Sequence, residues 1–325
     1  MRCESAAGVT PAEYYDERHA RGWMHAWPAY KKNRIVRLVR ELVPGPQARV
    51  LEFGCGEGVF AAAVKAACPT LEAHGCDISG AGVAKARDRF PDVEFHWLSP
   101  GGASVQPGAF DLVFSHHVLE HVQDLEDALS FTAGLLKPRG KVMHVIPCGN
   151  RGSVEFRLST AVKDGIGAGG LFALDDISHV RRLTTAELES ACRGAGLALR
   201  QAFYANQFWG GLDYLTGIYH GTIREWLRAF RGRSPLGSAR LFCLLALLLA
   251  ASLVRNGPAY VLSTVAHRRA AWKRALFTVA APFAVLAYPV SRLMSLLLET
   301  ARNLEWRFGK TRPNGSEAYL IFEKR

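Results

Sequence analysis

The sequence predicts an α/β fold in which a doubly wound sheet is joined to a largely α-helical insertion placed before the last strand. Three observations support this prediction. Strand-like and helix-like segments alternate from about residue 31 to 205, as in sheets covered by helices on both faces. A glycine-rich turn at 54–58 follows the first strand. The last ten residues, SEAYLIFEKR (316–325), have the apolar character of a buried strand.

The most informative segment is VLEFGCGEGVF, in which an apolar strand leads into Glu52 and then into Gly54, Gly56 and Gly58. Glycine adopts positive φ without strain and lets the backbone approach a ligand closely. A helix that opens at such a turn directs its N–H groups and its dipole toward the ligand. The spacing differs from the Gly-x-Gly-x-x-Gly of dinucleotide-binding turns. A nucleotide-type pocket is therefore predicted here, with a plain tight turn as the alternative.

The elements around this turn continue the alternation. KKNRIVRLVRELV (31–43) has apolar residues at helical spacing and is stopped by Pro-Gly-Pro. LEAHGCDIS (71–79) is predicted as the second strand and ends in Asp77. An acid at this place accepts hydrogen bonds from ribose hydroxyls in nucleotide-binding sheets. The alternative role for Asp77 is to cap the helix that follows, and one side chain can serve both roles.

Two further strands are predicted at VEFHWLS (93–99) and FDLVF (110–114), and the second of them is followed by SHHVLEHVQD. Glu120 and His121 are expected to begin the next helix. His117 and His121 are four residues apart, which suits a metal pair, but no Glu or Asp completes a ligand set convincingly. We therefore expect no bound metal.

The last part of the alternating region contains LLKPRGKVMHVIP (135–147), read as a helix end, a Pro-Arg-Gly turn and a fifth strand. ISHVRRLTTAELESACRGAGLALRQAF (177–203) then supplies a helix and a sixth strand. Thr184 or Thr185 is suited to cap that helix, with Glu187 or Glu189 in its first turn.

In this order, the acid-x-Gly-x-Gly-x-Gly run, Asp77, SHHVLEHVQD and the Lys-Pro-Arg-Gly turn resemble the Rossmann-like (class I) methyltransferases that use S-adenosylmethionine (SAM), in particular the type 11 and ubiquinone-biosynthesis members. The resemblance implies a seven-stranded Rossmann-like sheet, with strands six and seven antiparallel at its edge, and SAM as cofactor. It also implies cofactor contacts from Glu52, Gly54, Cys55, Gly56, Gly58, Asp77, Ile78, Ser99, Ser115 and His116.

The chain departs from this family after the third strand. Members often place an Asp there to contact the adenine amine, whereas this chain has Ser99 followed by Pro and Gly. Ser99 or nearby backbone is expected to take over that contact. The resemblance also divides the chain into a methyltransferase domain over 1–205 with 317–325, and an insertion over 206–316.

The insertion has a composition of its own. Residues 206–316 contain 15 Lys and Arg against 4 Asp and Glu, and the rest of the chain has 25 of each sign. The whole net charge of +11 therefore belongs to this segment. A basic, apolar segment attached to a neutral body indicates attraction to an anionic surface.

Two uncharged runs occur in the insertion, 14 residues at 241–254 and 17 residues at 275–291. As helices they reach roughly 21 and 26 Å, short of the roughly 30 Å of bilayer hydrocarbon. Arginines lie both before the first run and between the two, so a two-span hairpin conflicts with the positive-inside tendency. We expect a monotopic module on the cytoplasmic leaflet. A buried helical subdomain and a dimer interface are the alternatives.

The remaining composition places the protein in the cytoplasm. Seven scattered cysteines with no Cys-x-x-Cys pair fit a reducing compartment and predict neither a disulfide framework nor a zinc site. The N-terminal segment is polar and charged, so no signal peptide is predicted.

The implied reaction is methyl transfer from SAM to an oxygen nucleophile. A hydroxyl acceptor benefits from a general base, for which His121 and His179 are the candidates, with His116 or His117 behind them. The expected acceptor is a lipid-linked sugar, a glycolipid or a quinone precursor. The alternatives are a soluble acceptor handled within a biosynthetic complex, and a non-catalytic protein with the same fold. Nucleic acid is not expected, because the basic charge accompanies uninterrupted aliphatic runs.

Overall fold

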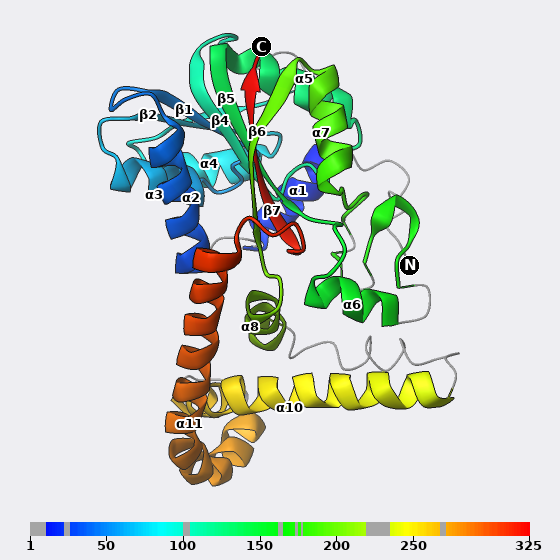
Figure 1. The fold of residues 1–325 in the computed structure, drawn as a ribbon. Helices are drawn as coiled ribbons and strands as arrows, with labels where there is room; N and C mark the ends of the chain where they lie inside the picture. Colours follow the sequence, from blue (N-terminus) through cyan, green and yellow to red (C-terminus); the bar gives the residue numbers. More distant parts are fainter. Residues whose placement is uncertain are drawn as a thin grey trace. The chain divides into compact units, whose positions relative to one another are not determined.

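The computed structural model describes residues 11–22, 27–99, 105–161, 165–172, 175–176, 178–218, 235–266 and 271–325 (Figure 1). It separates into two compact units. The sheet unit consists of Met1–Cys148, Asp176–Ala202 and Ala318–Arg325, and the helical unit consists of Gly149–Asp175 and Phe203–Glu317. The helical unit therefore takes in Gly149–Asp175 besides the insertion proposed from the sequence.

The sheet has seven strands in the order β3-β2-β1-β4-β5-β7-β6. The strands are β1 (Arg49–Phe53), β2 (Glu72–Asp77), β3 (Glu94–Trp97), β4 (Phe110–His116), β5 (Leu136–Pro147), β6 (Leu197–Ala205) and β7 (Glu317–Lys324). β1 pairs in parallel with β2 and β4, β2 with β3, and β4 with β5. The predicted fold class is confirmed, and the strand order reverses between β1 and β4.

The last strand returns to the sheet as predicted. Arg325 N–H donates to Gly196 O, and Ser316 N–H donates to Asn206 O, so β7 runs antiparallel to β6. β7 lies between β5 and β6, and its residues 318–322 are almost completely buried. An apolar strand inserted between two others loses both edges to hydrogen bonds and both faces to packing, which explains why SEAYLIFEKR lacks polar alternation.

The helices of the sheet unit are α1 (Pro11–Ala20), α2 (Ala29–Leu42), α3 (Val59–Ala67), α4 (Gly80–Arg89), α5 (Leu125–Leu135) and α7 (Thr185–Gly194). Thr184 caps α7 in a complete capping box with Glu187, as the sequence predicted. α2 packs against α3 and α5 packs against α7. α1 was not predicted, and it packs against α4.

The predicted Pro-Arg-Gly turn lies inside β5 rather than before it. β5 begins at Leu136, and the pairing register with β4 shifts between Phe110 and Leu112. Arg139 has a φ of 61°, so the turn is an irregularity that the strand continues through.

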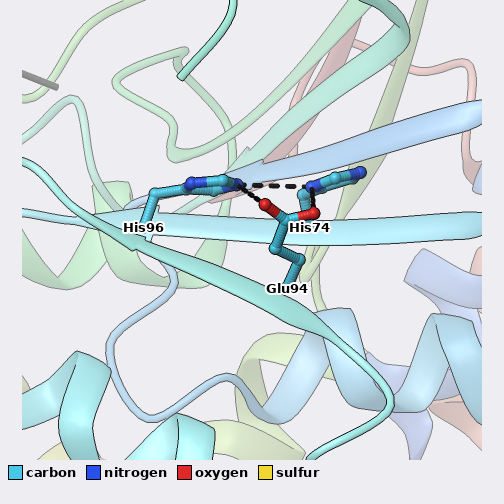
Figure 2. Close-up of side chains that lie close together, drawn as sticks. All are labelled: His74, Glu94 and His96. Atoms are coloured by element: carbon cyan, nitrogen blue, oxygen red, sulfur yellow. Dashed lines mark hydrogen bonds and ion pairs between the residues drawn. The ribbon is translucent and has the colours of Figure 1, made fainter. Parts of the chain in front are cut away.

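The paired strands β2 and β3 bring together three side chains on one face of the sheet. His74 lies opposite Glu94 in the parallel register, and His96 follows Glu94 by two residues (Figure 2). Because side chains alternate between the two faces along a strand, these three point to the same side.

The helical unit contains α6 (Val154–Ala161), a 3-10 turn (Ala168–Gly170), α8 (Trp209–Ile218), α10 (Pro235–Ala266) and α11 (Ala271–Gly309). α10 and α11 pack against each other and each packs against α8. α11 bends in its first half (Figure 1), the part that contains Pro282 and Pro289. Proline inside a helix removes a backbone hydrogen bond and is a usual cause of such a bend.

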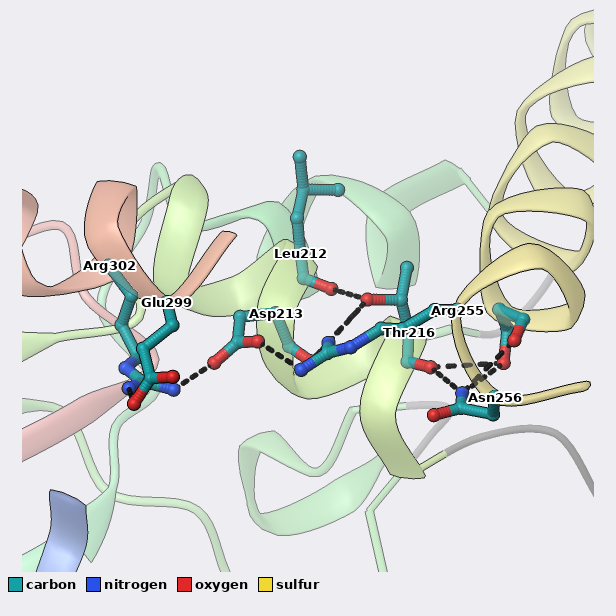
Figure 3. Close-up of polar contacts among 8 residues, drawn as sticks. Leu212, Asp213, Thr216, Arg255, Asn256, Glu299 and Arg302 are labelled. Atoms are coloured by element: carbon teal, nitrogen blue, oxygen red, sulfur yellow. Dashed lines mark hydrogen bonds and ion pairs between the residues drawn. The ribbon is translucent and has the colours of Figure 1, made fainter. Parts of the chain in front are cut away.

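Charged side chains are buried where these three helices meet (Figure 3). The Asp213 carboxylate of α8 pairs with Arg255 of α10 at 2.6 Å and with Arg302 of α11. Arg255 also donates to Asp213 O and to Thr216 Oγ1, at 2.7 and 2.9 Å. Asn256 donates to Thr216 O at 2.7 Å. One carboxylate thus joins three helices.

Both long helices contain a stretch that is long and apolar enough to cross a membrane, judged by length and composition only: Ala246–Val265 with 20 residues and Phe277–Gly309 with 33. These stretches are longer than the uncharged runs considered in the sequence, because the helices continue past flanking arginines. The expectation that both segments are too short to span is therefore wrong. Arg224, Arg228, Arg231, Arg233, Arg268 and Arg269 lie outside the described residues.

Candidate active site

A cavity of about 700 Å³ opens at the carboxyl ends of β1, β2 and β4. The strand order reverses between β1 and β4, and in open α/β sheets ligands bind in the crevice at that point. All of its lining residues belong to the sheet unit. Of the predicted cofactor contacts, it includes Glu52, Gly54, Cys55, Gly56, Asp77, Ile78, Ser99 and His116.

The glycine turn forms the cavity floor between β1 and α3. Gly54, Gly56 and Gly58 have φ values of 73°, 50° and 74°, which residues with a Cβ rarely adopt. The N–H groups of Gly54 and Cys55 both donate to Cys76 O, at 2.8 and 3.0 Å, and tie the turn to the end of β2. Gly58 does not line the cavity: a Cβ there would lie 2.5 Å from the Phe95 ring. Gly58 therefore packs closely against Phe95, and its predicted cofactor contact stays a prediction.

Glu52 is buried beneath the turn. Its Oε2 accepts a hydrogen bond from Ala61 N–H at 2.7 Å, so it caps the first turn of α3, whose own N-cap residue is a glycine without a side chain. Burial raises the pKa of Glu52 well above its usual value, against the Ala61 hydrogen bond, and the neighbouring Asp77 carboxylate adds to the increase. A cation bound nearby would favour its ionised form.

Asp77 ends β2 and is held by two backbone donors. Oδ2 accepts from Gly56 N–H at 2.7 Å and Oδ1 from Ser79 N–H at 2.8 Å. Burial raises the pKa of Asp77, and these two hydrogen bonds oppose the increase. An ionised carboxylate has about four acceptor positions, so both oxygens keep a further position for ligand hydroxyls.

The capping of α4, the alternative role for Asp77, falls to other residues. Ser79 Oγ accepts from Gly82 N–H at 3.0 Å. Asp16 of α1 accepts from Ala81 N–H at 2.9 Å and from Ser79 Oγ at 2.6 Å. Asp77 is therefore not needed as the cap and remains directed at the cavity, beside Ile78, Leu98 and Ser99.

The last two residues of β4 differ in position: one side chain lies in the core and the other lines the cavity. Ser115 does not line the cavity: its hydroxyl lies 2.8 Å from His144 Nδ1, and both side chains are completely buried. The Ser115 side chain thus points into the core, and the predicted cofactor contact of this residue stays a prediction. His116 does line the cavity, and its ring packs against Phe60 and Trp27 with centroid distances of 4.4 and 4.7 Å.

His121 also lines the cavity, and it lies in a turn rather than a helix. α5 begins only at Leu125, because Asp124 caps it by accepting from Asp127 N–H at 3.0 Å. The expectation that Glu120 and His121 begin that helix is therefore wrong. In the turn, the His121 ring lies 4.8 Å from the His179 ring between centroids. His179 itself does not line the cavity.

Glu120 completes this cluster and was missed in the sequence. Its side chain is almost fully buried, and Oε1 lies 3.0 Å from His117 Nδ1 and 4.0 Å from His179 Nε2. Burial alone would raise the pKa of Glu120, but the hydrogen bond with His117 and the nearby His121 and His179 bring it below the usual value. The judgement that no acid completes a set with these histidines was wrong.

The protonation of His121 follows from its neighbours. Nδ1 lies 3.3 Å from Ser178 O and 3.1 Å from Ser178 Oγ, and the Ser178 hydroxyl donates its own hydrogen to Asp176 Oδ1 at 2.5 Å. Both oxygens around Nδ1 therefore act as acceptors, which favours the ring hydrogen on Nδ1 and the basic lone pair on Nε2. Burial lowers the pKa of His121, although Glu120 opposes the decrease. His121 is thus a neutral imidazole near pH 7 and can accept a proton.

The segment that carries His179 is fastened to the turn by backbone and arginine contacts. Val180 N–H donates to Glu120 O at 2.8 Å. Arg181 donates to Val122 O, and to Gln123 O at 2.8 Å. The basic pair after His179 therefore has a local structural role.

Helix α1 adds residues to the site that the sequence analysis did not select. Tyr15 and His19 line the cavity, and the Tyr15 ring lies 5.9 Å from that of His121. Arg18 donates to Ser178 Oγ at 3.1 Å and pairs with Asp176 at 3.5 Å. The aromatic pair Tyr14-Tyr15 in an otherwise polar segment was the available signal.

The charge of the cavity tests whether SAM fits. Among the described residues, the lining contains no Lys or Arg, and its acids are Glu52, Glu57, Asp77, Asp124 and Asp127. A dinucleotide pyrophosphate is usually met by cationic side chains or a helix N-terminus, whereas the sulfonium and amino groups of SAM are cations. Aromatic rings at Tyr15, Trp27 and Phe60 add faces that attract a cation. The lining fits SAM.

Comparison with known proteins agrees with a SAM-binding site. A family model described as a methyltransferase domain matches residues 25–202. A ubiquinone biosynthesis O-methyltransferase of Paracidovorax citrulli is 28% identical over 209 residues, which are 61% of this chain and 85% of that protein. An uncharacterized methyltransferase of Mycobacterium tuberculosis is 33% identical over 105 residues, 32% of this chain and 52% of that protein. The matched part thus spans about half the length of the latter relative.

Solved structures include similar chains. A putative sarcosine dimethylglycine methyltransferase of Galdieria sulphuraria has a TM-score of 0.48 at 14% identity, covering 91% of this chain and 85% of that one. A phosphoethanolamine N-methyltransferase of Haemonchus contortus, solved in complex with S-adenosyl-L-methionine, has a TM-score of 0.44 at 14% identity, covering 90% of this chain and 52% of that one.

Proposed function

The chain belongs to the methyltransferase-domain family, and on this premise we propose that it transfers the methyl group of SAM to an oxygen of an amphiphilic acceptor held at the cytoplasmic face of a membrane. SAM supplies an electrophilic methyl group, so the protein mainly has to align the nucleophile with it. The observation that carries the proposal is the outer surface of α10 and α11.

That surface is apolar although it faces outward. Large apolar side chains with more than a third of their area exposed are Leu247, Leu253, Val254 and Tyr260 on α10, and Val279, Phe283, Val285, Leu286, Tyr288, Val290, Leu293, Leu296, Leu297, Leu304 and Phe308 on α11. Many of those on α11 are spaced by three or four residues and share one face of the helix. Exposed apolar surface of this extent marks a contact with lipid or protein.

The charge of the segment favours lipid over protein. The insertion has the whole excess of basic residues, and anionic lipids attract such segments before their apolar side chains insert. Basic residues lie before, between and after the two apolar runs, which favours a module that lies in one leaflet over a hairpin that crosses it. We therefore favour a monotopic arrangement and an acceptor that is itself lipid-linked, such as a polyprenyl-linked sugar, a glycolipid or a quinone precursor.

The sheet unit supports the chemistry as follows. Gly54, Gly56 and Asp77 would hold the cofactor, with Ile78 and Ser99 beside the adenosine part. His121 Nε2 would accept the proton of the acceptor hydroxyl. Glu120 would orient and stabilise the histidine cluster when it becomes charged, because it is an ionised carboxylate beside His117 and His179.

Two measurements test the proposal. The full chain, mixed with SAM and a membrane lipid extract, should yield one lipid species whose mass rises by one methyl substitution. The chain should also sediment with vesicles that contain anionic phospholipid, and less with pure phosphatidylcholine or at high salt. Methylation of only water-soluble acceptors, or recovery as a self-associated soluble species that ignores vesicles, would reject the membrane assignment. Absence of SAM binding by calorimetry would reject the enzyme.

A further inference from the structure

Three side chains with metal-ligating atoms converge on the paired strands β2 and β3 (Figure 2). The carboxyl end of β2 carries Asp77 and faces the cofactor cavity, whereas His74, Glu94 and His96 do not line that cavity. This cluster is therefore separate from the candidate active site, and the proposed reaction does not use it.

The spacing of the ligand atoms is the decisive observation. His74 Nδ1 lies 3.3 Å from His96 Nε2. The two Glu94 oxygens lie 3.3 Å from His74 Nδ1 and 3.6 Å from His96 Nε2. A tetrahedral zinc ion with bonds of about 2.0–2.1 Å holds its ligand atoms about 3.3–3.4 Å apart. We propose that His74, Glu94 and His96 bind a zinc ion, with solvent in the fourth position.

The surroundings prepare the site for a cation. His74 and His96 are only 5% and 9% exposed, and their rings are stacked with an interplanar angle of 14°. The His74 ring also packs edge-on against Phe110 at 5.2 Å, which fixes its orientation. The Glu94 side chain is 66% exposed and gives the ion a route from solvent. Two basic groups lie near the cluster: Arg49 is paired with Glu72 at 3.0 Å, and Arg87 donates to Phe95 O at 2.6 Å.

The position of the site indicates a structural role. β3 has four residues and is the edge strand of the sheet. A metal held by one ligand from β2 and two from β3 would clamp this edge, and Leu98 and Ser99 at the cavity directly follow β3. Metal binding to the folded chain also shifts the folding equilibrium toward it. The proposal does not depend on the methyl acceptor.

The competing explanation for the close spacing of the three side chains is a shared proton, because the two imidazoles can hydrogen-bond to each other and to Glu94. Zinc binding distinguishes the two. The full chain, freed of any affinity tag and treated with a chelator, is titrated with zinc chloride against a chromophoric competitor. We expect one zinc ion per chain bound at this site and a higher thermal midpoint. His96→Gln and Glu94→Gln should weaken the binding at least about 100-fold. Because Glu94→Gln changes an exposed side chain, this variant should fold normally. Unchanged SAM binding by the variant would verify its folding.

A matched control addresses the second histidine cluster, at Glu120, His121 and His179. His121→Asn should leave zinc binding at the β2–β3 site intact. The proposal is overturned if the full chain binds no zinc at micromolar concentration. It is equally overturned if Glu94→Gln and His96→Gln bind zinc as the unaltered chain does.

Discussion

The sheet unit and the helical unit differ in where they place their large apolar side chains. In the sheet unit, Leu51, Phe114 and Tyr319 are fully buried. In the helical unit, Asp213 is buried with two guanidinium groups, while Phe283 and Leu286 are 74% and 77% exposed. The first arrangement is suited to water on the outside. The second leaves apolar area uncovered, which the proposed lipid contact would bury.

The largest expected effect is on the rate of methyl transfer in the sheet unit, with cofactor binding unchanged. His121→Asn removes the proposed base while keeping a side chain of similar polarity. We expect kcat for methylation to fall by about 10²–10⁴-fold, because general bases contribute that much. SAM affinity by calorimetry and vesicle sedimentation should not change. A parallel loss of SAM affinity would show that His121 serves the cofactor pocket instead.

The next effect tests what holds the helical unit together. Asp213→Ala leaves Arg255 and Arg302 without their shared carboxylate in a buried place. Removing one partner of a buried ion pair costs about 3–5 kcal/mol, and urea unfolding followed by circular dichroism measures it. The matched control is Glu299→Ala, which removes the exposed partner of Arg302 and should cost about 0–1 kcal/mol. Equal losses in the two variants would contradict the three-helix role of Asp213.

These contrasts also show what the sequence made predictable. The strand–glycine–helix segment at 50–60 and the position of Asp77 follow from local patterns, the return of the last strand follows from the family resemblance, and the structure has all of them. Glu120 was missed because its partners are His117, three residues away, and His179, which only tertiary folding brings near. The full lengths of α10 and α11 were missed because a charge was taken as an end, although a helix continues through arginine.

The glycine turn gives a smaller effect that is confined to the sheet unit. Gly58→Ala places a Cβ at a φ of 74° and against Phe95, and we expect a loss of about 1–3 kcal/mol in folding free energy. Gly45→Ala is the control, since nothing lies within 4 Å of its Cβ position and its φ is not in the left-handed region. It should be neutral or stabilise by up to about 1 kcal/mol. Both are measured by thermal unfolding with and without SAM.

The acids of the cavity predict a pH dependence for cofactor affinity. Because burial raises the pKa of Glu52 and of Asp77, these groups hold protons to a higher pH than ordinary carboxyls. A cationic ligand favours their ionised forms, so SAM should bind more tightly as pH rises through these values, by at most about tenfold per pH unit for each proton released. Calorimetry in two buffers of different ionisation enthalpy counts the protons. The Glu52→Gln variant should release fewer protons when it binds SAM. An unchanged proton count would contradict the assignment of the pH dependence to Glu52.

The smallest expected effect on folding stability belongs to the exposed face of α11, which is where the helical unit differs most from the sheet unit. Phe283→Ser and Leu286→Ser change side chains that already face outward, so each should alter the free energy of unfolding by no more than about 0.5 kcal/mol in water. Vesicle sedimentation should nevertheless fall, since each removes apolar area that the proposed interface buries. Asn303→Ser, an exposed polar exchange on the same helix, should leave both properties unchanged. Unaltered sedimentation in the first two variants, together with a lost self-association, would assign this face to a second copy of the chain rather than to lipid.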